Sequence, residues 1–318
     1  MLLKYTLALI SILILFTTSL FVGVGELNIS GYLNGSHEQE LIMLASRLPR
    51  SFAVVLTGSA LAIVGVIMQK VAHNKFVEPT TAGTMDSAAL GILVASILMP
   101  QSSLMAKMLV ATGFSLVGSW VFLRILKHLP ITNPLLVPLV GIMLGGVIGS
   151  VAGFIAYEAD LIQYLSIWIS GDFSGILRGR YEMLWLTFGL SIGAYLIADQ
   201  LTIIGMGKNI SLNLGLNYRA ITSLGLIIVS MVTAIIVATV GMIPFIGLII
   251  PNLVNRFVGD DLRQALPIIA YVGGCLTLLC DIAGRLIIFP YEVPVSTIVG
   301  VTGSLAFIFL LLKRDTNV

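Results

Sequence analysis

Residues 51–70 read SFAVVLTGSALAIVGVIMQK, a run of 20 residues whose only charge is the final lysine. A helix of about 20 apolar residues crosses the roughly 30 Å hydrocarbon core of a bilayer. Runs of similar length and character recur along the whole chain rather than at one end. Unpaired backbone groups are costly in lipid, so these runs must be helices, and they lack the alternating faces of barrel strands. The sequence therefore predicts an all-α polytopic membrane protein.

The composition excludes a water-soluble fold. Hydrophobic residues make up 58% of the 318 positions and charged residues 10%, whereas soluble domains carry roughly 25% charged residues. We expect one transmembrane domain over residues 1–318, with no separate soluble module. The apolar run after Lys4 is too long for a signal peptide and is interpreted as a retained first helix. The ten predicted helices are 5–25, 51–70, 81–99, 104–127, 134–157, 182–200, 220–240, 243–258, 266–286 and 297–313.

The placement of Lys and Arg predicts the orientation. An even number of helices puts both termini on one side. With the N-terminus in the cytoplasm, 11 of the 17 Lys and Arg residues fall inside and 6 outside. This distribution favours cytoplasmic termini in an inner, or cytoplasmic, membrane. The outer cations are Arg47, Arg50, Lys107, Arg178, Arg180 and Arg285.

Several kinds of site are not indicated by the sequence. The two cysteines, Cys275 and Cys280, lie in one apolar segment and are interpreted as inert buried thiols. The three histidines have no Cys or His at ligand spacing, so no metal site and no cofactor is predicted. The formal net charge of +2 is too small to indicate a nucleic-acid partner.

Several stretches together carry a family resemblance. The strongest is GMIPFIGLIIPNLVNRFVGDD at residues 241–261, followed by DIAGR at 281–285 and YEVPVSTIVGVTGSLAFIFLLLKR at 291–314. Further matches are RLPRSFAVVLTGSALAIVGVIMQ at 47–69 and SLNLGLNYR at 211–219. In this order and spacing, they resemble the FecCD-type permeases, the membrane subunits of ABC importers for iron-siderophores, haem and vitamin B12. The likeness, which runs from about residue 41 to the end, is closer to ferric-siderophore members, particularly catecholate ones, than to cobalamin permeases.

This resemblance implies the type II ABC importer permease fold and a set of partners. They are a cytoplasmic ATPase dimer, an extracytoplasmic substrate-binding protein, and a second copy of the permease or a paralogue, with an iron-siderophore as cargo. The ATP hydrolysis is expected on the separate subunit, because the chain has no G-x-x-x-x-G-K-[ST] loop. The chain itself is therefore not expected to be an enzyme.

The resemblance also implies roles for particular residues. In the family, arginines at the positions of Arg47, Arg50 and Arg285 dock the binding protein. The alternative interpretation is that these three side chains snorkel at the membrane interface. The inner loop at about 201–219 couples to the ATPase through Ser211, Leu214, Gly215 and Arg219, with an ordinary solvated loop as the alternative. The fifth and tenth predicted helices, 134–157 and 297–313, line the translocation pathway. The residues expected in the pathway or its gate are Thr132, Asn133, Gly145 and Gly149. The glycine stripe that contains Gly145 and Gly149 also fits a helix-packing face.

The sequence departs from the family pattern at a few positions. The family commonly has His at Asn252, Gly at Ser296, and Asn-Pro-Leu where residues 74–76 read NKF. These departures leave the class intact.

Two other classes remain as alternatives. An ion-coupled secondary transporter would need a charged group near mid-membrane. Asp281 has Arg285 one turn later and fits an ion pair, whereas Asp86 is expected near the inner surface. An intramembrane enzyme is disfavoured because the chain contains no H-E-x-x-H and no D-D-x-x-D motif.

Overall fold

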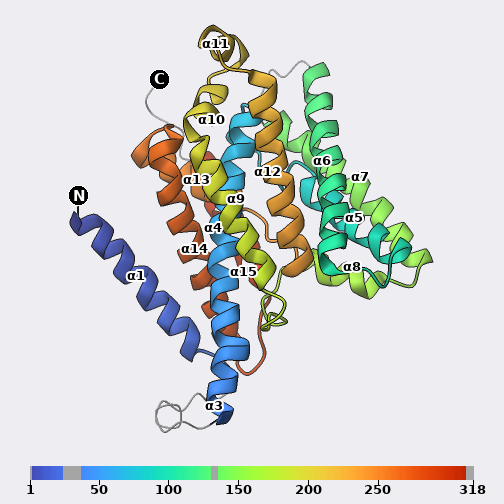
Figure 1. Ribbon diagram of the computed structural model, residues 1–318, viewed down its shortest axis with the longest axis vertical. Coiled ribbons are helices and arrows are strands. Elements are labelled where there is room, and N and C mark those ends of the chain that lie inside the picture. The colour runs from blue at the N-terminus through green and yellow to red at the C-terminus, as the bar shows by residue number, and fades with distance from the viewer. Residues whose placement is uncertain (1, 24–36, 130–134, 313–318) are drawn as a thin grey trace.

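The computed structural model describes residues 2–23, 37–129 and 135–312 (Figure 1). Within these residues the chain is helical apart from its connections and one isolated antiparallel bridge between Ile288 and Tyr291. The first half contains α1 (Leu2–Phe21), α3 (His37–Ile42), a π-helical turn (Met43–Arg47), α4 (Leu48–Val71), α5 (Thr84–Leu98), α6 (Leu104–His128) and α7 (Leu136–Glu158). The second half contains α8 (Ile162–Ile169), a 3₁₀ turn (Glu182–Leu184), α9 (Trp185–Leu196), α10 (Ala198–Gly205), α11 (Lys208–Asn213), α12 (Tyr218–Thr239), α13 (Ile246–Val258), α14 (Leu262–Ile287) and α15 (Val295–Leu312).

The predicted all-α polytopic fold is confirmed, with a helix at each of the ten predicted positions. Among the described residues, five helical stretches are long and apolar enough to cross a membrane. They are Gln39–Val71, Leu104–His128, Leu136–Glu158, Tyr218–Thr239 and Leu262–Ile287. The segments Glu182–Leu196 and Ala198–Gly205, which are bent by 65° relative to each other, make a sixth when they are counted as one span. Four other predicted helices have 10–17 described apolar residues, and crossing by each of them stays a prediction.

Helix α4 lies at the centre of the bundle and packs against α12, α13 and α14 (Figure 1). In the apolar window of the span that ends with α4, 83% of the residues are buried. Glycines allow the close crossings. A Cβ atom on Gly65 would lie 2.2 Å from the Cα atom of Gly247 in α13, and one on Gly58 would lie 2.5 Å from the carbonyl oxygen of Gly273 in α14. Small residues therefore set the helix spacing in this core, as is usual in membranes.

Helices α5, α6 and α7 pack together on the other side of the bundle from α1 (Figure 1). Of these, α7 is the most exposed, since only 22% of its apolar window is buried. Its exposed side chains are large and apolar, with Ile142, Met143, Val147 and Phe154 each more than half exposed. Such a face requires lipid or another protein surface around it.

Candidate functional site

A buried ion cluster joins α4, α14 and the α14–α15 connection. Arg50 Nη2 donates to Asp281 Oδ1 at 2.8 Å, and Arg50 Nη1 donates to Glu292 Oε1 at 3.0 Å. Asp281 also pairs with Arg285, one turn further along α14. The predicted Asp281–Arg285 ion pair is thus confirmed, and Arg50 and Glu292 extend it. One carboxylate group serves two guanidinium groups, so the three side chains depend on one another.

The same cluster holds the C-terminal end of α1. Arg285 Nη1 donates to the carbonyl oxygens of Ser19 at 2.8 Å and Val22 at 2.6 Å, and Arg285 Nη2 donates to Ser19 Oγ at 2.7 Å. Arg47 also donates to the Val22 carbonyl oxygen. Cations are favourable at a helix C-terminus because the last carbonyl groups lack intrahelical partners. These contacts fasten α1 to the rest of the bundle.

The three predicted docking arginines are therefore buried within this chain. The exposed fractions of Arg47, Arg50 and Arg285 are 8%, 9% and 2%. All three donate to acceptors of the chain itself, so interfacial snorkelling does not describe them. Docking of a second protein through these guanidinium groups stays a prediction, and it competes with the internal hydrogen bonds.

The connection between α4 and α5 carries a buried carboxylate that the sequence reasoning missed. Glu78 is 2% exposed, and its Oε1 accepts from the backbone N–H of Phe245 at 2.8 Å and from the Thr80 hydroxyl. Burial raises the pKa of Glu78 to about 7, although the hydrogen bonds from Thr80 and Phe245 lower it. Glu78 thus caps the start of α13 from another segment, as an anion does at a helix N-terminus. Its position before Pro79 in a polar break between two apolar runs was the available signal.

Two further hydrogen bonds fix α13 against α4 and the α4–α5 connection. Gln69 Nε2 donates to the carbonyl oxygen of Gly247 at 3.2 Å, and Asn252 Nδ2 donates to that of Lys75 at 2.8 Å. Asn252 stands where the resemblance expects His, and its amide still ties the two segments together. Contacts from α4 and from the α4–α5 connection therefore fix the first part of α13. Phe245, directly before this helix, has a left-handed backbone with φ of 68°.

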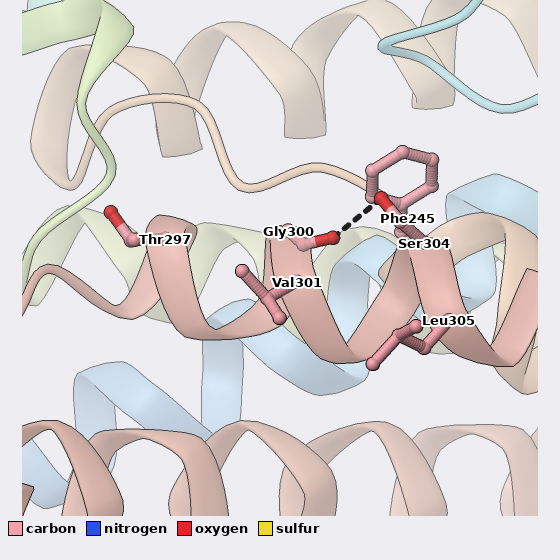
Figure 2. A pocket seen from close by; sticks show the side chains of 6 residues that line it. All are labelled: Phe245, Thr297, Gly300, Val301, Ser304 and Leu305. Atoms are coloured by element: carbon pink, nitrogen blue, oxygen red, sulfur yellow. Dashed lines mark hydrogen bonds between the residues drawn. The ribbon is translucent and has the colours of Figure 1, made fainter.

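An apolar hollow lies where Phe245 meets α15 (Figure 2). It has a volume of about 550 Å³. Gly303 lets the two segments approach, since a Cβ atom there would be 2.7 Å from Phe245 Cβ. In Figure 2 the Phe245 ring stands over α15 beside Ser304, whose hydroxyl donates to the Gly300 carbonyl oxygen at 2.7 Å. Helix α15, which is the predicted tenth helix, thus presents an open apolar surface. The hollow is lined by Phe245, Thr297, Gly300, Val301, Ser304 and Leu305.

The predicted path residues on α7 lie against the start of α5. Gly145 is buried and Gly149 is half-buried. A Cβ atom on Gly145 would lie 3.5 Å from the Cα atom of Gly83, the residue before α5. The predicted gate residues Thr132 and Asn133 lie outside the described residues.

The predicted coupling loop forms a short helix, α11, between two bends. Ser211 is buried and its hydroxyl donates to the Gly207 carbonyl oxygen at 2.9 Å, which closes the loop on itself. Leu214 is 60% exposed, and Gly215 has a left-handed backbone with φ of 76°. Arg219 is exposed in the first turn of α12. Ser211 thus shapes the loop, whereas Leu214, Gly215 and Arg219 lie on its surface.

The base of α11 is tied to the turn between α13 and α14. Lys70 packs against Gly205 at the end of α10 and pairs with Asp260 at 3.1 Å. Thr202 Oγ1 accepts from the backbone N–H of Leu262 at 3.0 Å. A displacement of α10, which leads into α11, would therefore reach α4 and the start of α14 through these contacts.

The closely packed apolar helices define a multi-pass membrane protein. Comparison with known proteins agrees with this class, since residues 11–313 match the FecCD transport family. The chain belongs to that family, as its sequence motifs predicted, and is a transport permease.

Individual relatives cover nearly the whole chain. The petrobactin import system permease protein YclN of Bacillus subtilis (strain 168) is 47% identical over 305 residues, which are 96% of this chain and 96% of that protein. The ferric-anguibactin transport system permease protein FatD of Vibrio anguillarum is 40% identical over 296 residues, which are 93% and 94% of the two chains. A solved inward-facing conformation of a metal-chelate type ABC transporter has a TM-score of 0.79 at 22% identity, and covers 96% of this chain and 97% of its own. This last likeness shows the shared fold.

Proposed function

We propose that the chain is the membrane permease subunit of an ATP-driven importer for an iron-siderophore, with a catecholate type as the preferred cargo. The observation that carries this proposal is the 47% identity over nearly the full length to a petrobactin import permease. The 40% identity to a ferric-anguibactin permease supports the same class of cargo. The protein lies in the cytoplasmic membrane, with both termini in the cytoplasm.

Energy comes from a cytoplasmic ATPase dimer that docks at α11. The exposed Leu214 and the left-handed turn at Gly215 support this role, because they give the loop a fixed shape with an apolar tip. The ties from α10 to the α13–α14 turn provide a route from the ATPase to the bundle. Two permease chains, either identical or paralogous, enclose the pathway between them. The exposed faces of α7 and α15 supply its walls.

A soluble binding protein delivers the cargo to the outer face, where Arg47, Arg50 and Arg285 lie. The three arginines with Asp281 and Glu292 leave one positive charge in excess, which favours an acidic partner. Arg47→Glu in nanodiscs should weaken binding of the receptor, and a Glu→Arg change on the receptor should restore it. If the Arg→Glu variants at all three positions bind the receptor with unchanged affinity, the three arginines only form hydrogen bonds and ion pairs within the chain and do not dock the receptor.

Reconstitution in liposomes, with and without the ATPase, tests the proposed function. We expect uptake of a ⁵⁵Fe-labelled siderophore only when the ATPase and ATP are present. Uptake that follows an ion gradient without ATP would instead identify a secondary transporter. A chemical product formed by the purified chain would identify an enzyme.

A further inference from the structure

The segment that leads into α9 carries two exposed arginines. Residues 173–182 read FSGILRGRYE, and the side chains of Arg178 and Arg180 are exposed, with Leu177 beside them 50% exposed. The segment lies at the end of the bundle opposite α11 (Figure 1), which is the end that the sequence predicts to be the outer one. In the described part of the chain neither arginine forms an ion pair, unlike the arginines of the buried cluster.

Backbone contacts fix the shape of this segment. Ile176 is buried and anchors it to the bundle. The backbone N–H of Arg178 donates to the carbonyl oxygen of Ala45 at 2.9 Å. The backbone N–H of Gly179, a residue with φ of 96°, donates to Glu182 Oε1 at 2.8 Å. Because backbone groups make these contacts, the guanidinium groups remain available to a partner.

The contact with Ala45 places the segment beside the buried ion cluster. Ala45 belongs to the π-helical turn Met43–Arg47, which continues into α4 and ends with Arg47. Arg47 is 8% exposed and donates to a carbonyl oxygen of the chain itself. A protein that approaches this end can therefore reach Arg178 and Arg180 without breaking contacts within the chain, which is not so for Arg47.

The charge of the segment indicates which kind of partner fits it. Residues 173–182 contain two arginines and one acidic residue, Glu182. The carboxylate of Asp172, just upstream, accepts hydrogen bonds from Ser174. Outer loops of membrane proteins usually hold few Lys and Arg residues, so a pair of exposed arginines there indicates a function other than orientation. Guanidinium groups pair with carboxylates through two parallel hydrogen bonds.

We propose that residues 173–182 form a docking surface for an acidic patch on the substrate-binding protein, which Arg178 and Arg180 contact. This inference rests on the proposed function, which supplies the binding protein. Exposed charges at the rim of an interface act mainly on the association rate, and salt screens their effect. The backbone contact with Ala45 joins the docked surface to the π-helical turn before α4, the central helix of the bundle.

The test measures association of the binding protein with the permease in nanodiscs of phosphatidylcholine, which offer no anionic headgroup, at low and high ionic strength. One variant combines Arg178→Glu with Arg180→Glu, and a second combines Arg178→Lys with Arg180→Lys, which keeps both charges. Lys107→Glu is the matched control, because Lys107 in the first turn of α6 is another cation predicted on the outer side. Thermal unfolding in the same nanodiscs checks that each variant is folded.

We expect the double Glu variant to associate about tenfold more slowly at low ionic strength, and the difference to shrink as salt is added. The double Lys variant and Lys107→Glu should associate at nearly the rate of the unmodified permease. An unchanged rate in the double Glu variant, or an equal loss in Lys107→Glu, would overturn the docking role.

A loss that appears only when phosphatidylglycerol is added to the nanodiscs would also overturn it, since lipid headgroups would then be the partner of the two arginines. Binding by the unmodified permease together with an unchanged double Glu variant removes this inference alone. If the unmodified permease does not associate with the binding protein at all, the proposed function fails and this inference fails with it.

Discussion

At the scale of single residues, the end of the bundle to which the C-terminus of α1 is fastened depends on one acidic side chain. Asp281 is fully buried and is the shared acceptor of Arg50 and Arg285. Removing one member of a buried ion pair leaves the remaining charge without compensation. Arg285 also holds the last carbonyl groups of α1, so the damage would extend to the seating of that helix.

Asp281→Asn should therefore lower the free energy of unfolding by about 3–5 kcal/mol, the usual cost of breaking a buried pair. Asp199→Asn is the matched control, because Asp199 pairs with Arg263 at 2.6 Å on the exposed surface. The control should change stability little, since exposed pairs are weak. Unfolding in mixed detergent micelles measures both variants. Equal stability of the two variants would contradict the structural role of the cluster.

The sequence predicted only the local part of this chemistry. The Asp281–Arg285 pair follows from their spacing of four residues on one helix. Arg50 lies 231 residues from Asp281, and Glu78 lies 167 residues from Phe245. Those contacts depend on which helices are neighbours in the fold. The hydrophobic periodicity of a single helix does not show which helices lie beside it.

At the scale of helices, the glycine crossings make α4 sensitive to added volume. Gly65→Ala would place a methyl group 2.2 Å from the Cα atom of Gly247, which is backbone and cannot rotate away. Overpacking of this kind costs about 1–3 kcal/mol. Gly113→Ala in α6 is the control, because a Cβ atom there meets nothing within 4 Å. Titration with a denaturing detergent should separate the two variants, and equal stability would mean that α4 and α13 can move apart without cost.

The exposed tip after α11 gives a prediction about coupling. Leu214→Gln should reduce the stimulation of ATP hydrolysis by loaded binding protein, since it removes an apolar contact with the ATPase and leaves the bundle untouched. Leu98→Gln is the matched control, because Leu98 is 73% exposed at the C-terminal end of α5. Gly215 is a poorer test site, since its positive φ makes any side chain strained. Full stimulation in Leu214→Gln would remove α11 as the docking element.

The helices were more predictable than their ends and interruptions. Each of the ten apolar runs from which a helix was predicted corresponds to a helix in the structure. The sequence did not show that α4 continues upstream through a π-helical turn into α3, or that residues 182–205 bend by 65° between α9 and α10. It also gave no helix between the predicted helices 134–157 and 182–200, where the structure has the apolar helix α8. These features depend on packing and on single backbone bends, which leave little trace in hydropathy.

At the scale of the whole molecule, we propose that one chain provides half of a pathway. Helices α7 and α15 keep large apolar side chains exposed, and the hollow beside Phe245 opens outward rather than into the bundle. The buried chemistry of the chain, from Glu78 to Asp281, holds helices in place. The surfaces that remain free in a single chain are therefore the ones available to cargo, a second permease and the ATPase.

The most direct test of the central claim is the choice of cargo under ATP. Proteoliposomes containing the permease, its ATPase and its binding protein are supplied in parallel with a ⁵⁵Fe-labelled catecholate siderophore and with labelled cobalamin. We predict ATP-dependent accumulation of the ferric siderophore and no accumulation of cobalamin above a control without ATP. Accumulation of cobalamin, or of neither compound while the ATPase remains active, would contradict an iron-siderophore permease.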